Sequence, residues 1–324
     1  MSRPEGVEGP TLTVDSSRLE LRPGLRASDA TLTLEMRSSQ GAEHVLSLPE
    51  GATLQAVRIQ GQEQPIRQEG RHVTLPVTPG SRTVELDWRE PRGMGLGFVA
   101  SEVDLGIASV NTEVHLAVPQ NRWALFVGGP RMGPVVLFWP FVVVLVAIAW
   151  VLARLPLTPL RWHHWALLLL GLTQVPVWAG ALVVGWPLVL GWRKARGREL
   201  RGRWFDLLQV ALAGWTLLAA VALVVSLRQG LLGLPEMQVA GNGSSSELLR
   251  WYLDRSEGLL PQPWVLSVPL LVYRGVMLAW ALWLAVALTR WARWGWACFS
   301  DGEFWRGHRP PPSPPVQEPI DVPR

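Results

Sequence analysis

The sequence predicts an α+β membrane protein, in which an N-terminal all-β, sandwich-like soluble domain over residues 1–132 precedes an α-helical transmembrane bundle of four to five spans. Two observations lead to this fold class. The first 132 residues hold 16 of the 26 acidic side chains, and their apolar residues alternate with polar ones. The remainder consists of long uncharged runs between arginine clusters, and only one of the 19 tryptophans precedes Trp123. A chain of 324 residues is long enough for two such units.

The β prediction depends on period-two alternation, which places one face of a strand on a core and the other in water. Turn signals of Gly and Pro separate the alternating stretches about every ten residues, a spacing typical of an antiparallel β-sandwich. The alternating apolar residues are Leu32, Leu34 and Met36; Leu46 and Leu48; Val57 and Ile59; Val73, Leu75 and Val77; Val84, Leu86 and Trp88; and Val114, Leu116 and Val118.

Candidate chemistry in the β domain is sparse. His44, His72 and His115 fall on separate predicted strands with no close histidine pair, so we interpret them as separate surface or edge side chains rather than a zinc site. The glycine-rich run 93–97 resembles a phosphate loop, but residues 98–103 read as a strand where a dinucleotide fingerprint needs a helix. We therefore predict a flexible connection or bulge there, no metal site and no cofactor.

The transmembrane domain is predicted over residues 133–290, with spans near 134–153, 206–227 and 266–289. Residues 162–192 carry no Arg, Lys or acid, but they are too many for one straight span. Either they form one long kinked helix or they form a hairpin of two short ones. Between the last two spans, residues 228–263 are predicted to be an external loop. Residues 291–324 are predicted to be a cytoplasmic, proline-rich tail.

Sidedness follows from the basic residues, which flank spans on the cytoplasmic side. The densest cluster is predicted to lie in a cytoplasmic loop, and this placement favours membrane topology over nucleic-acid binding as its role. Its members are Arg193, Lys194, Arg196, Arg198, Arg201 and Arg203.

Counting back from this cytoplasmic loop, one helix over 162–192 puts the β domain inside the cell, and a hairpin puts it outside. A basic flank at Arg154 and Arg161 favours the hairpin. The shortness of its arms and the lack of an apolar N-terminal signal stretch argue against it. We expect the hairpin, with five crossings and an extracytoplasmic β domain.

Several runs resemble a known group of proteins: residues 235–245 (PEMQVAGNGSS), 170–174 (LGLTQ), 280–283 (WALW) and 293–296 (RWGW). They are similar to the C-terminal part of large uncharacterised bacterial inner-membrane proteins, in which large soluble regions precede a closing cluster of spans. The resemblance implies a bacterial inner membrane and an extracytoplasmic β region. It implies no activity, cofactor or partner.

Two places are candidate sites. Arg274 is the one full charge in the interior of a predicted span, since Asp206 stands at the very start of its span, so Arg274 either pairs with an anion or snorkels to the outer interface as an anchor. In the external loop, Ser246 is predicted to start a short interfacial or docking helix. The docking residues of that loop are Asn242, Ser244, Ser245, Trp251 and Tyr252.

No catalytic motif is found in the sequence, so an enzyme is the least favoured class. We expect a non-enzymatic interaction or scaffold protein of the cell envelope; the alternative is a subunit of a membrane transport or channel assembly. The expected partners are the lipid bilayer and proteins bound through the β domain or a homo-oligomer, with no nucleic acid.

Overall fold

The computed structural model describes residues 11–196 and 203–301, and the chain divides into two compact units. The β unit comprises the chain up to Val143 together with Pro235–Gly275. The helical unit comprises Val144–Leu234 and the chain from Val276 onward. The β unit is therefore assembled from two segments that are almost a hundred residues apart in sequence.

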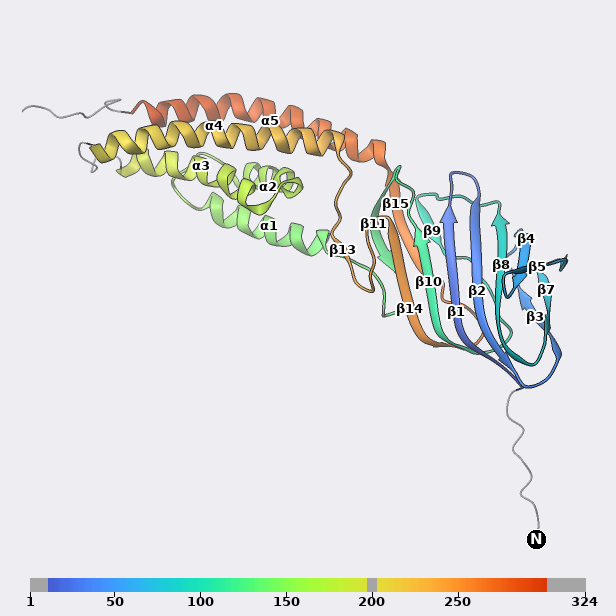
Figure 1. The fold of residues 1–324 in the computed structure, drawn as a ribbon. Coiled ribbons are helices and arrows are strands. Elements are labelled where there is room, and N and C mark those ends of the chain that lie inside the picture. The colour runs from blue at the N-terminus through green and yellow to red at the C-terminus, as the bar shows by residue number, and fades with distance from the viewer. Residues whose placement is uncertain (1–10, 197–202, 302–324) are drawn as a thin grey trace, which may run out of the picture. The chain divides into compact units, whose positions relative to one another are not determined.

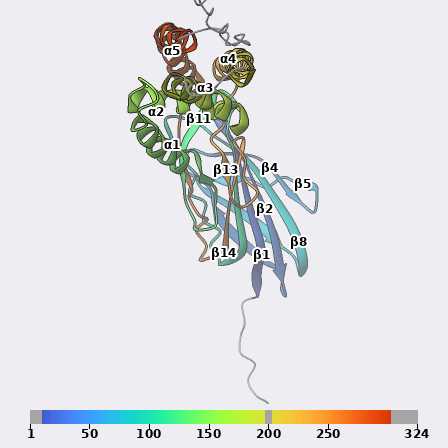
Figure 2. The same ribbon diagram turned by 90° about the vertical axis from the view of Figure 1, so that its left-hand side faces the viewer.

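A seven-stranded sheet dominates the β unit (Figure 1). Its strands, in spatial order, are β14 (Leu248–Ser256), β10 (Ser109–Ala117), β1 (Leu12–Pro23), β2 (Ser28–Ser38), β8 (Gly80–Glu90), β4 (Thr53–Ile59) and β5 (Gln62–Gln64). All neighbours are antiparallel except β1 and β10, which run parallel. Figure 2 shows β14, β1, β2 and β8 as the long strands of this sheet.

Three smaller sheets complete the unit. One has the order β11 (Arg122–Gly128), β15 (Trp264–Pro269) and β9 (Gly97–Val99); one has the order β3 (Ala42–Ser47), β7 (His72–Val77) and β6 (Gln68–Glu69); the last pairs β12 (Val135–Val136) with β13 (Val239–Ala240). One continuous apolar core joins the inner face of the seven-stranded sheet to the two three-stranded sheets.

The N-terminal β-rich region is confirmed, and its core residues are those whose alternation predicted it. Leu32, Leu34 and Met36 on β2, for example, are at most 1% exposed, as is Leu86 on β8. Outward positions between them carry Thr31, Thr33 and Glu35 and stay accessible to water. The period-two pattern thus identified which side of each strand faces the core.

The prediction for residues 228–263 is wrong in its secondary structure. In place of a loop with a short helix from Ser246, residues Leu248–Ser256 form the strand β14 along β10, and Trp264–Pro269 form β15 along β11. The local reason is again period two, because Leu249 and Trp251 are buried while Arg250 and Tyr252 face outward. The β unit consequently extends beyond the predicted boundary at residue 132.

The helices are α1 (Phe138–Ala153), α2 (Trp162–Gly171), the 3-10 turn η1 (Leu172–Gln174), α3 (Val177–Arg196), α4 (Arg203–Leu232) and α5 (Leu270–Phe299). Helices α1 and α5 begin in the β unit and continue into the helical unit. Side-chain donors join them: Trp215 Nε1 donates to the Leu182 carbonyl at 2.8 Å, and Trp280 Nε1 donates to the Leu167 carbonyl at 2.8 Å. Figures 1 and 2 show α3 lying alongside α4.

The predicted bundle of four to five spans is contradicted, because within residues 11–196 and 203–301 only α4 and α5 are long and apolar enough to cross a membrane. Helix α1 has 16 residues, so it rises about 24 Å against a hydrocarbon core of about 30 Å. The run 162–192 breaks at η1 and Pro176 into the 10-residue α2 and the separate α3. Helix α3 ends in Arg193, Lys194 and Arg196, which shorten its apolar part.

The predicted tail boundary also shifts. Helix α5 continues to Phe299, so residues 291–299 are helical rather than part of a tail, and the proline-rich residues beyond 301 lie outside the described part of the chain. Similarly, the predicted span 266–289 begins too early, because residues up to Pro269 belong to β15.

Candidate functional site

The predicted docking loop folds as a tight turn that leads into β14. Gly241, Asn242 and Gly243 all have positive φ, at 103°, 48° and 66°. The Ser244 amide donates to the Gly241 carbonyl at 2.9 Å, which closes the turn. Glycine and asparagine tolerate this left-handed conformation best, which explains the Gly-Asn-Gly sequence.

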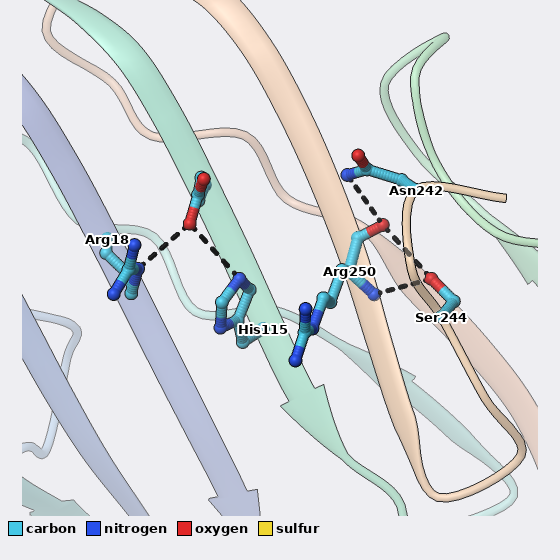
Figure 3. A network of polar contacts seen from close by, with 6 residues as sticks. Arg18, His115, Asn242, Ser244 and Arg250 are labelled. Carbon is cyan, nitrogen blue, oxygen red and sulfur yellow. Dashed lines mark hydrogen bonds and ion pairs between the residues drawn. The ribbon is translucent and has the colours of Figure 1, made fainter.

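Three of the predicted docking residues satisfy the backbone of β14, an edge strand of the seven-stranded sheet. Asn242 Nδ2 and Ser244 Oγ both donate to the Arg250 carbonyl at 3.3 Å, and the Arg250 amide donates to Ser244 Oγ at 3.0 Å (Figure 3). Ser245 Oγ accepts from the Leu248 amide at 3.2 Å. These side chains replace a missing neighbour strand, so they protect a sheet edge that would otherwise invite pairing with another chain.

Trp251 cannot dock a partner, because it is 1% exposed and belongs to the core of the β unit. Its indole packs against Gly133, where a β-carbon would come within 2.3 Å of Trp251 Cδ1. Tyr252 faces outward, and its hydroxyl donates to Asn111 Oδ1 at 2.8 Å. Asn111 has φ 50° and also donates to the Asp15 carbonyl at 3.1 Å.

Beside Tyr252, the outer face of β1, β10 and β14 carries a network of ionisable side chains, which we call the polar ladder: Arg18, Glu20, Glu113, His115 and Arg250. Arg18 Nε donates to Glu113 Oε2 at 2.9 Å, and His115 Nε2 lies 3.3 Å from the same oxygen. Strand register places Arg18 opposite Glu113 and His115 opposite Arg250, and Figure 3 shows Arg18, His115 and Arg250 in a row across the three strands.

The surroundings of His115 favour its neutral form, chiefly through burial. Burial lowers the pKa of His115, and the positive charges of Arg18 and Arg250 act in the same direction, while Glu113 opposes them. Glu113 thus accepts a hydrogen bond from the Arg18 guanidinium and has the His115 imidazole beside it. Alternating charges of this kind suit recognition of a charged protein surface, because each charge must meet an opposite charge on the partner. The pattern therefore fixes how the two surfaces align.

The basic residues that were predicted to set the membrane topology differ in their surroundings. Lys194 and Arg196 are exposed on the last turn of α3, and Arg203 is exposed at the start of α4; Arg198 and Arg201 lie outside the described residues. Arg193 is different, because it is 2% exposed.

Arg193 caps the C-terminal end of α5. Its Nε donates to Gln209 Oε1 at 2.8 Å, its Nη1 donates to the Cys298 carbonyl, and its guanidinium lies 5.3 Å from the centre of the Phe205 ring. Gln209 Nε2 donates to the Phe299 carbonyl at 3.1 Å. A cation at a helix C-terminus satisfies carbonyls that have no partner within the helix and complements the helix dipole. Arg193 therefore stabilises the helical unit in addition to any influence on topology.

Arg274 is exposed and lies just over one turn into α5. Within the described residues, no hydrogen bond or ion pair to its guanidinium is found. Its neighbour Tyr273 is 4% exposed and packs edge-on against Trp123, with 5.2 Å between ring centroids. This position fits an anchor whose charge reaches the interface.

The histidines do not assemble into a metal site. His44 Nε2 bonds the Leu105 carbonyl at 2.7 Å, and His72 Nδ1 lies 3.1 Å from Ser47 Oγ. No group of three or more His, Cys, Asp or Glu side chains able to hold a metal ion occurs in the described ranges. The glycine-rich run 93–97 leads into β9 and packs tightly, since a β-carbon at Gly93 would lie 2.3 Å from the Leu25 backbone.

The helical unit contains an apolar groove of about 500 Å³. Small side chains of α4 and α5 form much of its wall, with Trp186 and Trp296 at its sides. Trp186 Nε1 donates to Thr216 Oγ1 at 2.8 Å, so these two polar groups at the groove are already bonded to each other.

Sequence reasoning missed the polar ladder and the cap made by Arg193. Charges at alternate positions, as in Arg18 with Glu20 and Glu113 with His115, could have indicated a solvated strand face. No local signal links Glu113 to Arg250, because their strands are adjacent only in the folded sheet.

No protein-family model and no curated protein matches the chain. Among solved structures, it is similar to an M1 zinc metallopeptidase from Deinococcus radiodurans, with 16% identity over 38% of this chain and 35% of that chain and a TM-score of 0.27. A mutant of an M1 zinc metallopeptidase from the same organism, bound to a Tyr-Ser-Ala substrate, gives 18% identity, 37% of each chain and a TM-score of 0.26. The chain spans little more than a third of these proteins, and likeness at this level carries no argument about activity.

Proposed function

We propose that this protein is a non-enzymatic, membrane-anchored scaffold of a bacterial inner membrane, in which α4 and α5 hold the β unit at the membrane and the β unit binds a protein partner. The observation that carries the proposal is the apolar outer surface of the two 30-residue helices. On α4, Leu207, Val210 and Leu217 are 60–67% exposed, and on α5 Leu282 is 63% exposed. Apolar side chains left bare along the full length of a helix are stabilised by lipid rather than water.

Strand pairing supports one orientation. Because β14 and β15 pair with β10 and β11, the connection between α4 and α5 must lie on the same side of the membrane as the N-terminal strands. With Lys194, Arg196 and Arg203 on the cytoplasmic side, the β unit is extracytoplasmic.

The polar ladder, continued by Tyr252, is the proposed partner surface. It combines two guanidinium groups, two carboxylates and an aromatic hydroxyl on one face, a composition suited to a charged protein partner. The edge protection by Asn242 and Ser244 favours side-chain recognition on the sheet face over addition of a strand at the edge of β14.

A subunit of a transport or channel assembly is the second candidate function. The groove between α3, α4 and α5 is lined by apolar side chains, and Arg274 is exposed near the start of α5. A path for a polar solute needs polar groups along it. The observations therefore favour the scaffold, and a homo-oligomer that completes a pore would favour the alternative.

Two measurements test the proposal. Alkaline extraction of cell membranes should leave the chain in the pellet, and its release would contradict anchoring by α4 and α5. A photo-crosslinking amino acid at Tyr252 should capture a defined protein in intact cells, whereas the same probe at Glu63, on the far edge strand β5, should not. Equal adducts at both positions, or none at Tyr252, would exclude the polar ladder as the partner surface.

A further inference from the structure

The sheet of β11, β15 and β9 is apolar on both faces. Its inner face supplies Phe98 and Val265, which are 2% and 0% exposed, to the core. The outer face should then be polar, as it is on the seven-stranded sheet. Instead it carries Val99, Phe126, Trp264 and Leu266, with exposed fractions of 38–45%.

These side chains form one surface because of strand register. Trp264 pairs with Val99, and Leu266 pairs with Phe126, so paired residues project to the same side. Trp139, in the first turn of α1, stacks on Phe126 with 5.0 Å between ring centroids and 3° between ring planes. We call Val99, Phe126, Trp139, Trp264 and Leu266 the aromatic patch.

The aromatic patch is held in a defined geometry. The indole of Trp264 covers Gly128, where a β-carbon would come 2.5 Å from Trp264 Cε2. Trp139 Nε1 donates to the Leu125 carbonyl at 2.8 Å, which fixes the ring that stacks on Phe126. An exposed, uncharged and ordered apolar surface of this kind marks an interaction site.

Continuity with α5 identifies what covers the patch. Strand β15 ends at Pro269 and α5 begins at Leu270, so Leu266 lies four residues from the start of that helix. At about 3.3 Å per residue this is about 13 Å of chain, which is within reach of the interfacial layer of a bilayer that α5 enters. Tryptophan prefers this layer, where its ring is partly in hydrocarbon and its N–H can meet water or headgroups.

We propose that the aromatic patch rests in the interfacial layer of the bilayer and so orients the β unit on the membrane. This inference rests on the proposed anchoring by α5. The polar ladder lies on the outer face of the seven-stranded sheet and the patch on the outer face of the β11–β15–β9 sheet, and the inner faces of both sheets contribute to one core. Lipid contact at the patch therefore leaves the polar ladder accessible to a protein partner.

The test uses the full chain in vesicles of phosphatidylcholine and phosphatidylglycerol whose acyl chains are brominated both near the headgroup and near the terminal methyl group, so that bromine meets probes at the interface and at the middle of the bilayer. A fluorophore is placed on single cysteines at Leu266→Cys in the patch, Thr33→Cys on the outer face of β2, and Leu217→Cys on the exposed side of α4. All three positions are accessible to a reagent, and the unmutated chain, whose Cys298 is 0% exposed, is the labelling blank.

Brominated lipid should quench the probes at 266 and 217 and leave the probe at 33 unchanged. Quenching at 217 but not at 266 overturns the patch while the membrane anchor stands. Quenching at 266 but not at 217 keeps lipid contact at the patch and refutes the anchor. Quenching at neither 266 nor 217 rejects both the proposed orientation and the anchor. Equal quenching at 33 and 266 rejects the proposed orientation.

Discussion

Gly133 and Trp251 show how a single glycine supports the core of the β unit. Because a β-carbon at position 133 would lie 2.3 Å from Trp251 Cδ1, Gly133→Ala forces the buried indole to move. We expect a loss of about 1–3 kcal/mol in the free energy of unfolding, the usual cost of overpacking. Thermal unfolding of the full chain in detergent measures it. Gly97→Ala, where a β-carbon meets nothing within 4 Å, is the control, and an equal loss there would refute the packing argument.

Arg193 should matter for stability far more than its neighbours in the same basic cluster. Arg193→Met removes the donors to Gln209 and to the Cys298 carbonyl and leaves those buried acceptors unpaired, at a cost of about 1–3 kcal/mol. The exposed Lys194→Met should have little effect. The rate at which a thiol reagent modifies the buried Cys298 reports opening of this end of the helical unit. Equal rates in the two variants would contradict the capping role.

His44 makes the stability of the β unit depend on pH. Burial lowers the pKa of His44 below its ordinary value of 6.5, so the unfolded chain takes up the proton first as the pH falls. Stability is therefore full above pH 6.5 and decreases with pH down to the lower pKa of the folded state. His115 contributes with the same sign.

The corresponding variant is His44→Gln, which keeps a donor for the Leu105 carbonyl and cannot titrate. Denaturant unfolding at a series of pH values should show a shallower dependence below pH 6.5 than the unmutated chain. A slope unchanged in His44→Gln would show that this imidazole is not the titrating group.

Strand β14 explains why the N-terminal segment is not a complete domain. Residues 1–132 contain β10 and β11 but lack β14 and β15, so the isolated segment loses Trp251 and Val265 from its core and exposes two strand edges. The continuous run of alternating strands suggests that residues 1–132 fold on their own. Because β14 and β15 are missing from this segment, we do not expect it to do so. Unpaired edges of this type promote aggregation.

We predict that residues 11–136 joined to 239–269 by a short Gly-Ser linker fold, while residues 11–132 alone aggregate. The pairing of Val136 with Val239 brings the joined ends together, so the linker need not span a long distance. Circular dichroism and size-exclusion chromatography compare the two chains. A monomeric, β-rich 11–132 segment would show that β14 and β15 are dispensable.

At the scale of the whole molecule, the discontinuous β unit ties membrane topology to strand pairing. Cysteines at Thr33 and Ser245 should react alike with an impermeant thiol reagent on intact cells, because both belong to the β unit, and Arg196→Cys should react only after permeabilisation. Labelling at 33 and 245 but not at 196 is the expected result. Different accessibility of 33 and 245 would be incompatible with the β10–β14 pairing in the membrane-bound protein.

Local sequence was sufficient to identify the β-rich N-terminal region, the buried face of strands such as β2 and β8, and the apolar character of α4 and α5. These features repeat every two residues or extend over a long run, so neighbours in the chain reveal them. Tertiary structure alone decided that β14 completes the first sheet, that Trp251 is core, and that Arg193 is a buried helix cap. Each of these depends on contacts between residues about a hundred or more positions apart. The pattern of a short apolar run fits a helix and a strand equally well until the segment it packs against is known.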